Sequence, residues 1–290
     1  MVEVSSMNEL DEVVRQFREK SKCPCEPSGR TIGPPITWFR GQSNSNYPLI
    51  PSLYRLKLEN NEMYKEFEVN AISNYMEKCR CLGVSIEDTS WDIFYSMQHY
   101  GVKTRALDWS ESYLIGLFFA FEKWNPDKND AALYLLDPVA LNFIVTGNRD
   151  VMVAKDDDEK YSYGKYLSGR DAGTIAVEPR PKENAENLVN KRILKQKGRF
   201  TLHETKWPLE AELEIRLASR ENRAQYFSKW SKASDVLLKV NLKKQVYSEV
   251  RELLLQNGID HTYVYPDIEG VAHFVNRSSL PKKDDWYNYQ

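Results

Sequence analysis

The segment from Gln98 to Ser110 contains the densest group of reactive side chains in the sequence. It reads Gln-His-Tyr-Gly-Val-Lys-Thr-Arg-Ala-Leu-Asp-Trp-Ser, and so combines an imidazole, a phenol, a guanidinium, a carboxylate and an indole with two hydroxyls. Such a run is too polar for a core strand and too aromatic for a solvated linker, and an apolar helix is expected directly after it, over 113–121. A polar turn before a buried helix presents backbone N–H groups at the helix N-terminus, where anions are favoured. The segment therefore indicates a ligand-binding site.

Each reactive residue of this segment also has an ordinary structural interpretation. His99 is a candidate general base, but a histidine at a helix end commonly caps carbonyl groups. Asp108 would pair with Arg105 or Arg40, or cap the following helix. Trp109 offers a surface for stacking or belongs to the core. The clustering of these residues beside a glycine favours a site.

Three other segments carry candidate ligand-binding groups. Arg40 ends an expected strand, where it could grip a phosphate or form a salt bridge, and the glycine after it lets the backbone approach a ligand. Arg192 and Gln196 share one face if 190–198 is helical, although a solvated basic helix has the same pattern. Asp267 and Glu269 place two carboxylates on a turn, which turn chemistry alone also explains. The motifs of serine hydrolases and of phosphate-binding loops are absent from the sequence.

The elements that must position these residues indicate an α+β fold. Apolar residues at helical spacing predict helices over 8–20, 63–79, 90–99, 112–124 and 243–257. Strand-like runs occupy 36–42, 132–137, 236–242 and 263–265. Because helices and strands mix without regular alternation, we expect one domain with a mixed, largely antiparallel central sheet flanked by helices.

Composition excludes several classes of protein. The 290 residues are 41% hydrophobic and 12% aromatic, which is ample for a packed core. Charged residues make up 28%, yet the net charge is −2, so charge alone predicts no general affinity for nucleic acid. No apolar run approaches the roughly 18 residues of a membrane span, and we expect a cytoplasmic protein without a membrane partner.

A metal site is not expected. The cysteines form the close pairs Cys23/Cys25 and Cys79/Cys81, whose spacers are shorter than the roughly two to four residues usual in zinc sites. Reduced structural thiols explain them better. The acidic run 156–159 is typical of a solvated loop.

Taken in order, these segments resemble the FRG domain family, named for its Phe-Arg-Gly motif. The matching positions are Phe39-Arg40-Gly41, His99-Tyr100-Gly101, Thr104 to Trp109, Leu117 to Ala120, Arg192-Ile193, Gln196, Gly198, Phe200-Thr201 and Tyr265 to Gly270. The resemblance implies an FRG domain over 30–276, preceded by an N-terminal helix and loop over 1–29 and followed by a polar tail over 277–290. Lys103 and Ala106 depart from the Pro and Leu that are commoner in the family.

A weaker resemblance links the chain to arginine-specific ADP-ribosyltransferases, which carry a similar Arg-Gly strand and a later helix ending in Phe-Ala. It implies an ADP-ribosyltransferase-like fold with NAD as substrate and no metal. The implied catalytic residues are Arg40 on the pyrophosphate, His99, and a late carboxylate, Asp267 or Glu269, with Glu212 and Glu214 as substitutes. Gly41 would admit the nicotinamide amide, Tyr100 or Trp109 would stack on the ring, and Thr104 would orient the ribose. The expected ligand-binding residues are Phe39, Gly41, Tyr100, Gly101, Thr104, Arg105, Asp108, Trp109, Arg192 and Gln196.

Three functions follow, and the sequence leaves open whether the chain is an enzyme. The first is an NAD-binding enzyme that transfers ADP-ribose or cleaves NAD, as a toxin or antiviral defence effector, with a protein or nucleic acid as acceptor. The second is a non-catalytic sensor that binds a nucleotide, a nucleic-acid end or a peptide. The third is a metal-independent nuclease that uses His99 with Arg40 and Arg105.

Overall fold

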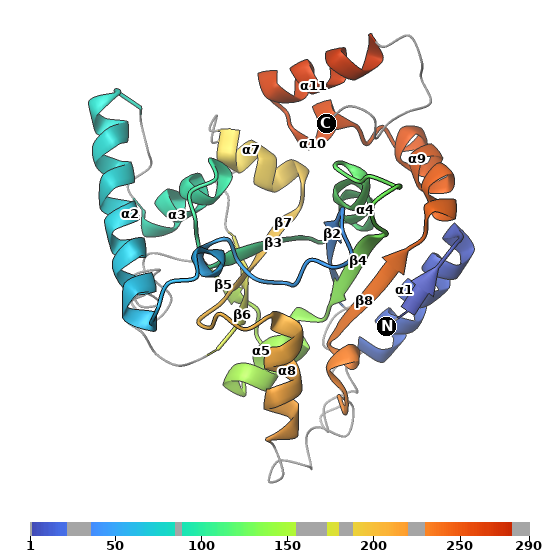
Figure 1. Ribbon diagram of the computed structural model, residues 1–290, viewed down its shortest axis with the longest axis horizontal. Coiled ribbons are helices and arrows are strands. Elements are labelled where there is room, and N and C mark those ends of the chain that lie inside the picture. The colour runs from blue at the N-terminus through green and yellow to red at the C-terminus, as the bar shows by residue number, and fades with distance from the viewer. Residues whose placement is uncertain are drawn as a thin grey trace.

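One mixed sheet of eight strands forms the framework of the computed structural model, which describes residues 2–21, 36–84, 89–154, 173–179, 188–219 and 230–279 (Figure 1). The strands are β1 (Val2–Val4), β2 (Trp38–Gln42), β3 (Ala106–Ser110), β4 (Ala131–Leu136), β5 (Met152–Val153), β6 (Ile175–Glu178), β7 (Gly198–Leu202) and β8 (Leu237–Leu242). Their order is β1-β8-β4-β2-β3-β7-β6-β5. The two edge pairs, β1–β8 and β5–β6, are parallel, and the pairs between them are antiparallel. The predicted mixed, largely antiparallel sheet is confirmed.

Helices cover both faces of this sheet. The longer ones are α1 (Met7–Ser21), α2 (Asn61–Cys81), α3 (Ser90–His99), α4 (Tyr113–Phe121), α5 (Pro138–Thr146), α7 (Leu188–Lys195), α8 (Leu209–Ala218), α9 (Tyr247–Gln256) and α11 (Ile268–Ser278). Shorter turns are η1 (Leu53–Leu56), η2 (Ala233–Asp235), η3 (Lys244–Val246) and α10 (His261–Val264). Helices α1, α4 and α9 share a core with one face of β2, β4 and β8, whereas α5 and α8 pack on the opposite face. Helix α3 packs with α7 against β6 and β7. None of the described helices is long and apolar enough to cross a membrane.

Helix α4 crosses β2 at a distance that only glycine permits. A Cβ atom on Gly41 would lie 2.7 Å from the Phe119 carbonyl carbon and closer still to the Gly116 oxygen and the Ala120 nitrogen. A Cβ atom on Gly116 would lie 2.8 Å from the Cβ of Phe39. The glycine of the Phe-Arg-Gly motif therefore serves helix packing. The close approach to a ligand that the sequence suggested for Gly41 stays a prediction.

The sheet opens between β2 and β3. These strands pair only through Phe39 and Ser110, whereas β2 is paired with β4, and β3 with β7, along their whole lengths. Beyond that pair the two strands separate, and the Arg40 side chain bridges the gap by donating to the backbone carbonyl of Asp108. Each half of the sheet is continuous, so the opening lies at the boundary between the halves.

Two local predictions are wrong. Residues 106–110 form a central strand rather than a turn, because its polar groups find partners: the Trp109 indole donates to the Thr201 hydroxyl at 2.9 Å, and the exposed Asp108 bonds to Gln98. Residues 263–265 form no strand, because Asp260 accepts a hydrogen bond from the Tyr263 amide and so starts the short helix α10.

The first residues belong to the same core as the rest of the chain. Strand β1 extends the sheet beside β8, and Leu10, Val14 and Phe17 of α1 are buried in the core that contains α4. The domain limits 30–276 and 277–290 stay predictions.

Candidate functional site

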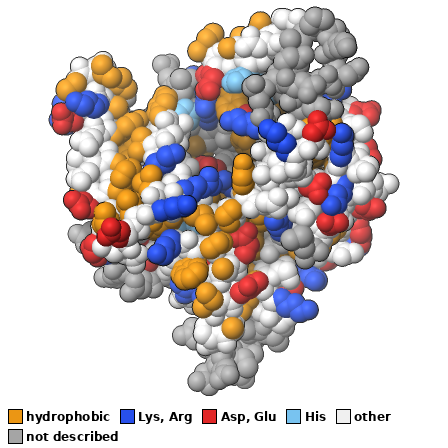
Figure 2. Space-filling model, in the orientation of Figure 1, with side chains coloured by type: hydrophobic (Ala, Val, Ile, Leu, Met, Phe, Trp, Pro, Cys, Tyr) orange, Lys and Arg blue, Asp and Glu red, His pale blue; other side chains and the backbone are white. Residues whose placement is uncertain are grey.

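A pocket of about 550 Å³ lies at the opening between β2 and β3. Its walls come from β2, the end of β3, α3, the C-terminal end of α4, α7, β7 and Tyr265. Figure 2 shows a hollow near the middle of this face, with lysine and arginine side chains around it. Segments far apart in the sequence therefore converge on one site.

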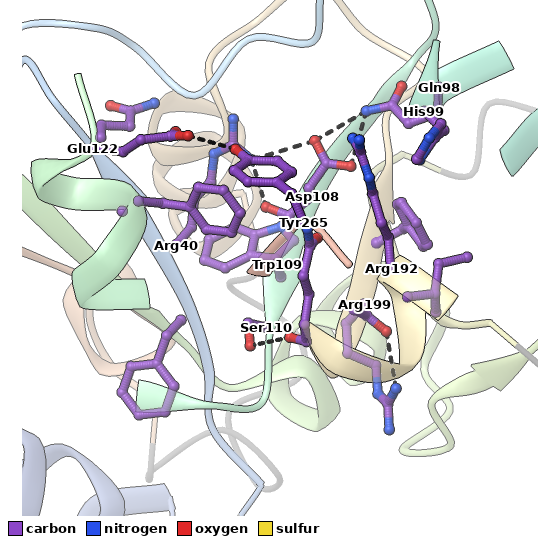
Figure 3. Close-up of a pocket in the computed structure, with 18 of the residues that line it drawn as sticks. Arg40, Gln98, His99, Asp108, Trp109, Ser110, Glu122, Arg192, Arg199 and Tyr265 are labelled. Carbon is purple, nitrogen blue, oxygen red and sulfur yellow. Dashed lines mark hydrogen bonds and ion pairs between the residues drawn. The ribbon is translucent and has the colours of Figure 1, made fainter. Parts of the chain in front are cut away.

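Arg40 of β2 lines this pocket and is labelled in Figure 3. Besides its bond to the Asp108 carbonyl, its guanidinium lies 3.8 Å from the Asp108 carboxylate, and its side chain is 18% exposed. Its Nε is buried without a hydrogen-bond partner among the described residues. Burial lowers the pKa of Arg40; the nearby Asp108 carboxylate raises it, and Arg55 lowers it further. The arginine is thus incompletely satisfied.

Arg55 brings a second guanidinium to the same pocket. Its Nε donates to the Ile50 carbonyl at 3.0 Å, and no described carboxylate forms an ion pair with it. Two like charges therefore act on each other in the same pocket, and a bound anion would relieve their repulsion.

Asp108 is held in place by a chain of hydrogen bonds. Gln98 donates to both of its carboxylate oxygens at 3.0 Å, and the Thr104 hydroxyl donates to the Gln98 side-chain oxygen. Thr104 is 2% exposed and does not line the pocket. It positions Gln98, and so has no free group with which to orient a ribose.

Several residues predicted to bind the ligand lie outside the pocket. Arg105 forms a buried ion pair with Glu68 of α2, which ties that helix to β3. Tyr100 is 60% exposed and packs edge-on against His99, and Gly101 forms the following turn with φ of 79°. Phe39 and Gly41 line the pocket, but both are engaged by α4.

His99 does line the pocket, beside Gln98. Burial, and next the charge of Arg192, lower its pKa to about 4. The imidazole is therefore neutral at physiological pH, suited to donating or accepting a hydrogen bond rather than to holding a positive charge.

Arg192 joins α7 to the segment that leads into α11. Its guanidinium binds the Asp267 carboxylate, with Nε at 2.8 Å, and the Glu269 carboxylate at 2.9 Å. Gln196 donates to the Val264 carbonyl at 3.0 Å. Burial alone raises the pKa of Asp267, but hydrogen bonds from Arg192 and the backbone outweigh it and lower the pKa. Arg192 and Gln196 line the pocket, whereas Asp267 and Glu269 lie outside its lining.

Sequence reasoning missed Arg55, Arg199 and Glu122, which all line the pocket. Arg199 of β7 pairs with Glu111 at 2.9 Å and with Glu178 at 3.0 Å, so its charge is compensated. Glu122 follows α4 and accepts a hydrogen bond from the Tyr265 hydroxyl at 2.6 Å. Only the tertiary fold brings these residues together, and no local motif marks them.

Within the part of the chain that the structure describes, no three His, Cys, Asp or Glu side chains cluster as a metal site would require. Cys79 and Cys81 of α2 are free thiols. Cys23, Cys25 and the acidic run 156–159 lie outside the described residues.

Residues 36–129 match the family model of the FRG domain. Comparison with curated proteins gives no match, and comparison with solved structures gives none either. The matched residues include β2, α3, β3 and α4, and so supply Arg40, Arg55, Asp108 and Glu122 to the pocket. Helix α7, β7 and Tyr265 complete the pocket from outside the matched span.

Proposed function

We propose that this chain, which contains an FRG domain, binds a dinucleotide between β2 and β3 and acts on NAD as an ADP-ribosyltransferase-like enzyme. The presence of both Arg40 and Arg55 in the lining of one pocket is the observation that carries the proposal. Both guanidiniums face one pocket, and the Arg40 Nε lacks a partner among the described residues. A diphosphate would place anionic oxygens against both groups, in the bidentate geometry that arginine favours.

The other walls of the pocket suit the rings of a nucleotide. Its volume lies within the range of about 300–1,000 Å³ that is usual for small-molecule sites. Phe119 and Tyr265 provide aromatic surface, and Tyr47 is 55% exposed while it also lines the pocket; Trp109 is 3% exposed and belongs to the core. Phe119, Tyr265 and Tyr47 support stacking of an adenine or nicotinamide ring.

The proposed reaction is transfer of ADP-ribose to a protein or nucleic-acid acceptor, or cleavage of NAD by water. Either outcome would suit a toxin or antiviral defence effector. The nuclease alternative loses one of its three residues, because Arg105 is buried against Glu68 and lies outside the pocket lining.

Calorimetry with NAD, ADP-ribose and adenosine tests the proposal. We expect NAD and ADP-ribose to bind, and adenosine, which has no phosphate, to bind at least tenfold more weakly. Arg40→Gln should lose binding of both phosphorylated ligands, whereas the exposed Arg15→Gln, on α1, should retain it. If neither NAD nor ADP-ribose binds, the proposal is refuted.

Release of nicotinamide from NAD then separates the enzyme from the sensor. Release that depends on Arg40 supports the enzyme, and tight binding without release supports the sensor. RNA degradation that persists in a chelator and disappears in His99→Ala would favour the nuclease instead.

A further inference from the structure

The pocket also contains a carboxylate, that of Glu122, which forms no ion pair with a lysine or arginine among the described residues. Glu122 has a side chain that is 13% exposed; its Oε1 accepts the Tyr265 hydroxyl at 2.6 Å and lies 3.9 Å from the His261 Nε2. Its Oε2 forms no hydrogen bond with a described residue, and no described lysine or arginine pairs with it. One oxygen is therefore anchored, and the other is available to a ligand.

The fold strengthens the negative potential at this place. Glu122 is the C-cap residue of α4, so it lies where the partial negative charge of the helix dipole is concentrated. The guanidinium of Arg192 lies 4.9 Å from the centre of the Tyr265 ring and is already paired with Asp267 and Glu269. Helix α4 and Glu122 thus both favour a cation.

Tyr265 fixes the orientation of this carboxylate (Figure 3). Burial, and next the neighbouring Glu122 charge, raise the pKa of Tyr265 above its usual value, so the phenol stays protonated and donates a hydrogen bond to Glu122. A carboxylate held in this way can meet a ligand without first losing side-chain freedom.

Arg40, Arg55 and Glu122 line the same pocket, and this combination of charges calls for a ligand that carries both a negative and a positive group. We infer that Glu122 binds the cationic ring of a dinucleotide whose diphosphate lies at Arg40 and Arg55, so that the pocket selects the oxidised, pyridinium form over the reduced, neutral form. This inference rests on the proposed function. It assigns Glu122 a specificity role that is independent of any catalytic step.

The ratio of the dissociation constants of NADH and NAD tests this role, because the two ligands share the diphosphate and differ in the charge of the ring. We expect the wild type to bind NAD roughly tenfold more tightly than NADH, as expected for one added charge interaction. Glu122→Gln, which keeps the shape and an acceptor for Tyr265, should bring the ratio close to one without changing the affinity for ADP-ribose. Glu77→Gln, at an exposed position on α2, is the matched control and should keep the wild-type ratio.

The possible outcomes distinguish the two proposals. A wild-type ratio near one, or an unchanged ratio in Glu122→Gln, would overturn the role of Glu122. Binding of ADP-ribose in the same experiment would still support the proposed function. If none of the three ligands binds, both proposals fall. If Glu122→Gln does not fold, as judged by circular dichroism, Tyr265→Phe provides the second test, since loss of the anchoring hydroxyl should reduce the ratio.

Discussion

Replacement of Arg105 by methionine tests whether this arginine supports the fold or binds the ligand. The Arg105 and Glu68 side chains are 5% and 3% exposed, and the Arg105 Nε donates to the two carboxylate oxygens at 2.9 and 3.0 Å. Methionine fills similar space but leaves the Glu68 charge buried without its guanidinium. Breaking a buried pair in this way costs about 3–5 kcal/mol, against a total stability of about 5–15 kcal/mol for an ordinary domain. We therefore expect the substitution to remove a large part of the free energy of unfolding.

Urea unfolding followed by tryptophan fluorescence measures this loss. The midpoint for Arg105→Met should fall well below that of the wild type, and the double variant with Glu68→Met should recover much of the difference, because two apolar side chains can replace a buried pair. Arg15→Met is the control, since the Arg15 side chain is 62% exposed in its pair with Glu12, and the midpoint of this variant should not differ measurably from that of the wild type.

A ligand-binding role for Arg105 gives the opposite result. Arg105→Met would then unfold at the wild-type urea concentration and lose affinity for ADP-ribose under conditions where it is folded. Such a result would refute the structural interpretation of the Glu68–Arg105 pair.

Three further predictions concern the glycine of the motif, the pocket histidine and the C-terminal helices. Gly41→Ala should prevent soluble expression, because its Cβ would overlap the α4 backbone, whereas Gly101→Ala, whose φ is positive but whose surroundings are open, should cost about 1 kcal/mol; equal stability of the two variants would contradict this. Because the pKa of His99 is lowered to about 4 in the folded protein, the unfolded chain binds this proton more readily between about pH 6.5 and 4. The stability that His99 contributes is complete above that window and is lost as the pH falls through it, so urea midpoints at pH 7.5 and 5 should differ less in His99→Gln than in the wild type. Arg192→Met should speed hydrogen exchange in residues 261–278 with little change in exchange of the β4 amides, and unchanged exchange there would show that the ion pairs with Asp267 and Glu269 do not hold this segment.

Local patterns in the sequence were sufficient to predict most of the framework. The spacing of apolar residues predicted α1, α2, α3, α4 and α9, and the β-branched and apolar runs predicted β2, β4 and β8. In each case the periodic spacing of apolar residues within one segment marks its buried face, so this face can be recognised without knowing which element covers it. Strand β3 was missed because the partners of its polar side chains, Gln98 and Thr201, lie on other elements.

The site was predicted less completely, because it depends on contacts between distant segments. Arg40, His99, Asp108 and Gln196, which the sequence singled out, line one pocket, and their roles there stay predictions. The sequence could not show that Arg105 forms an ion pair with Glu68, or that Asp267 forms one with Arg192, because the two residues of each pair are distant in the sequence. Glu122 carried no signal of its own; its importance comes from the partner that Tyr265 provides.

The arrangement of the strands also affects the order in which the protein can be completed during synthesis. Val2 pairs with Val240, so β1 must wait for β8, whereas β3, β5, β6 and β7 can pair after only about the first 202 residues have emerged. Contacts between residues so far apart form slowly, because a long loop must close before they contribute any stability. Tyr265, which anchors Glu122, emerges later still. The pocket is therefore among the last parts of the molecule to form, and a nascent or truncated chain would lack the complete pocket until the rest of the fold has assembled.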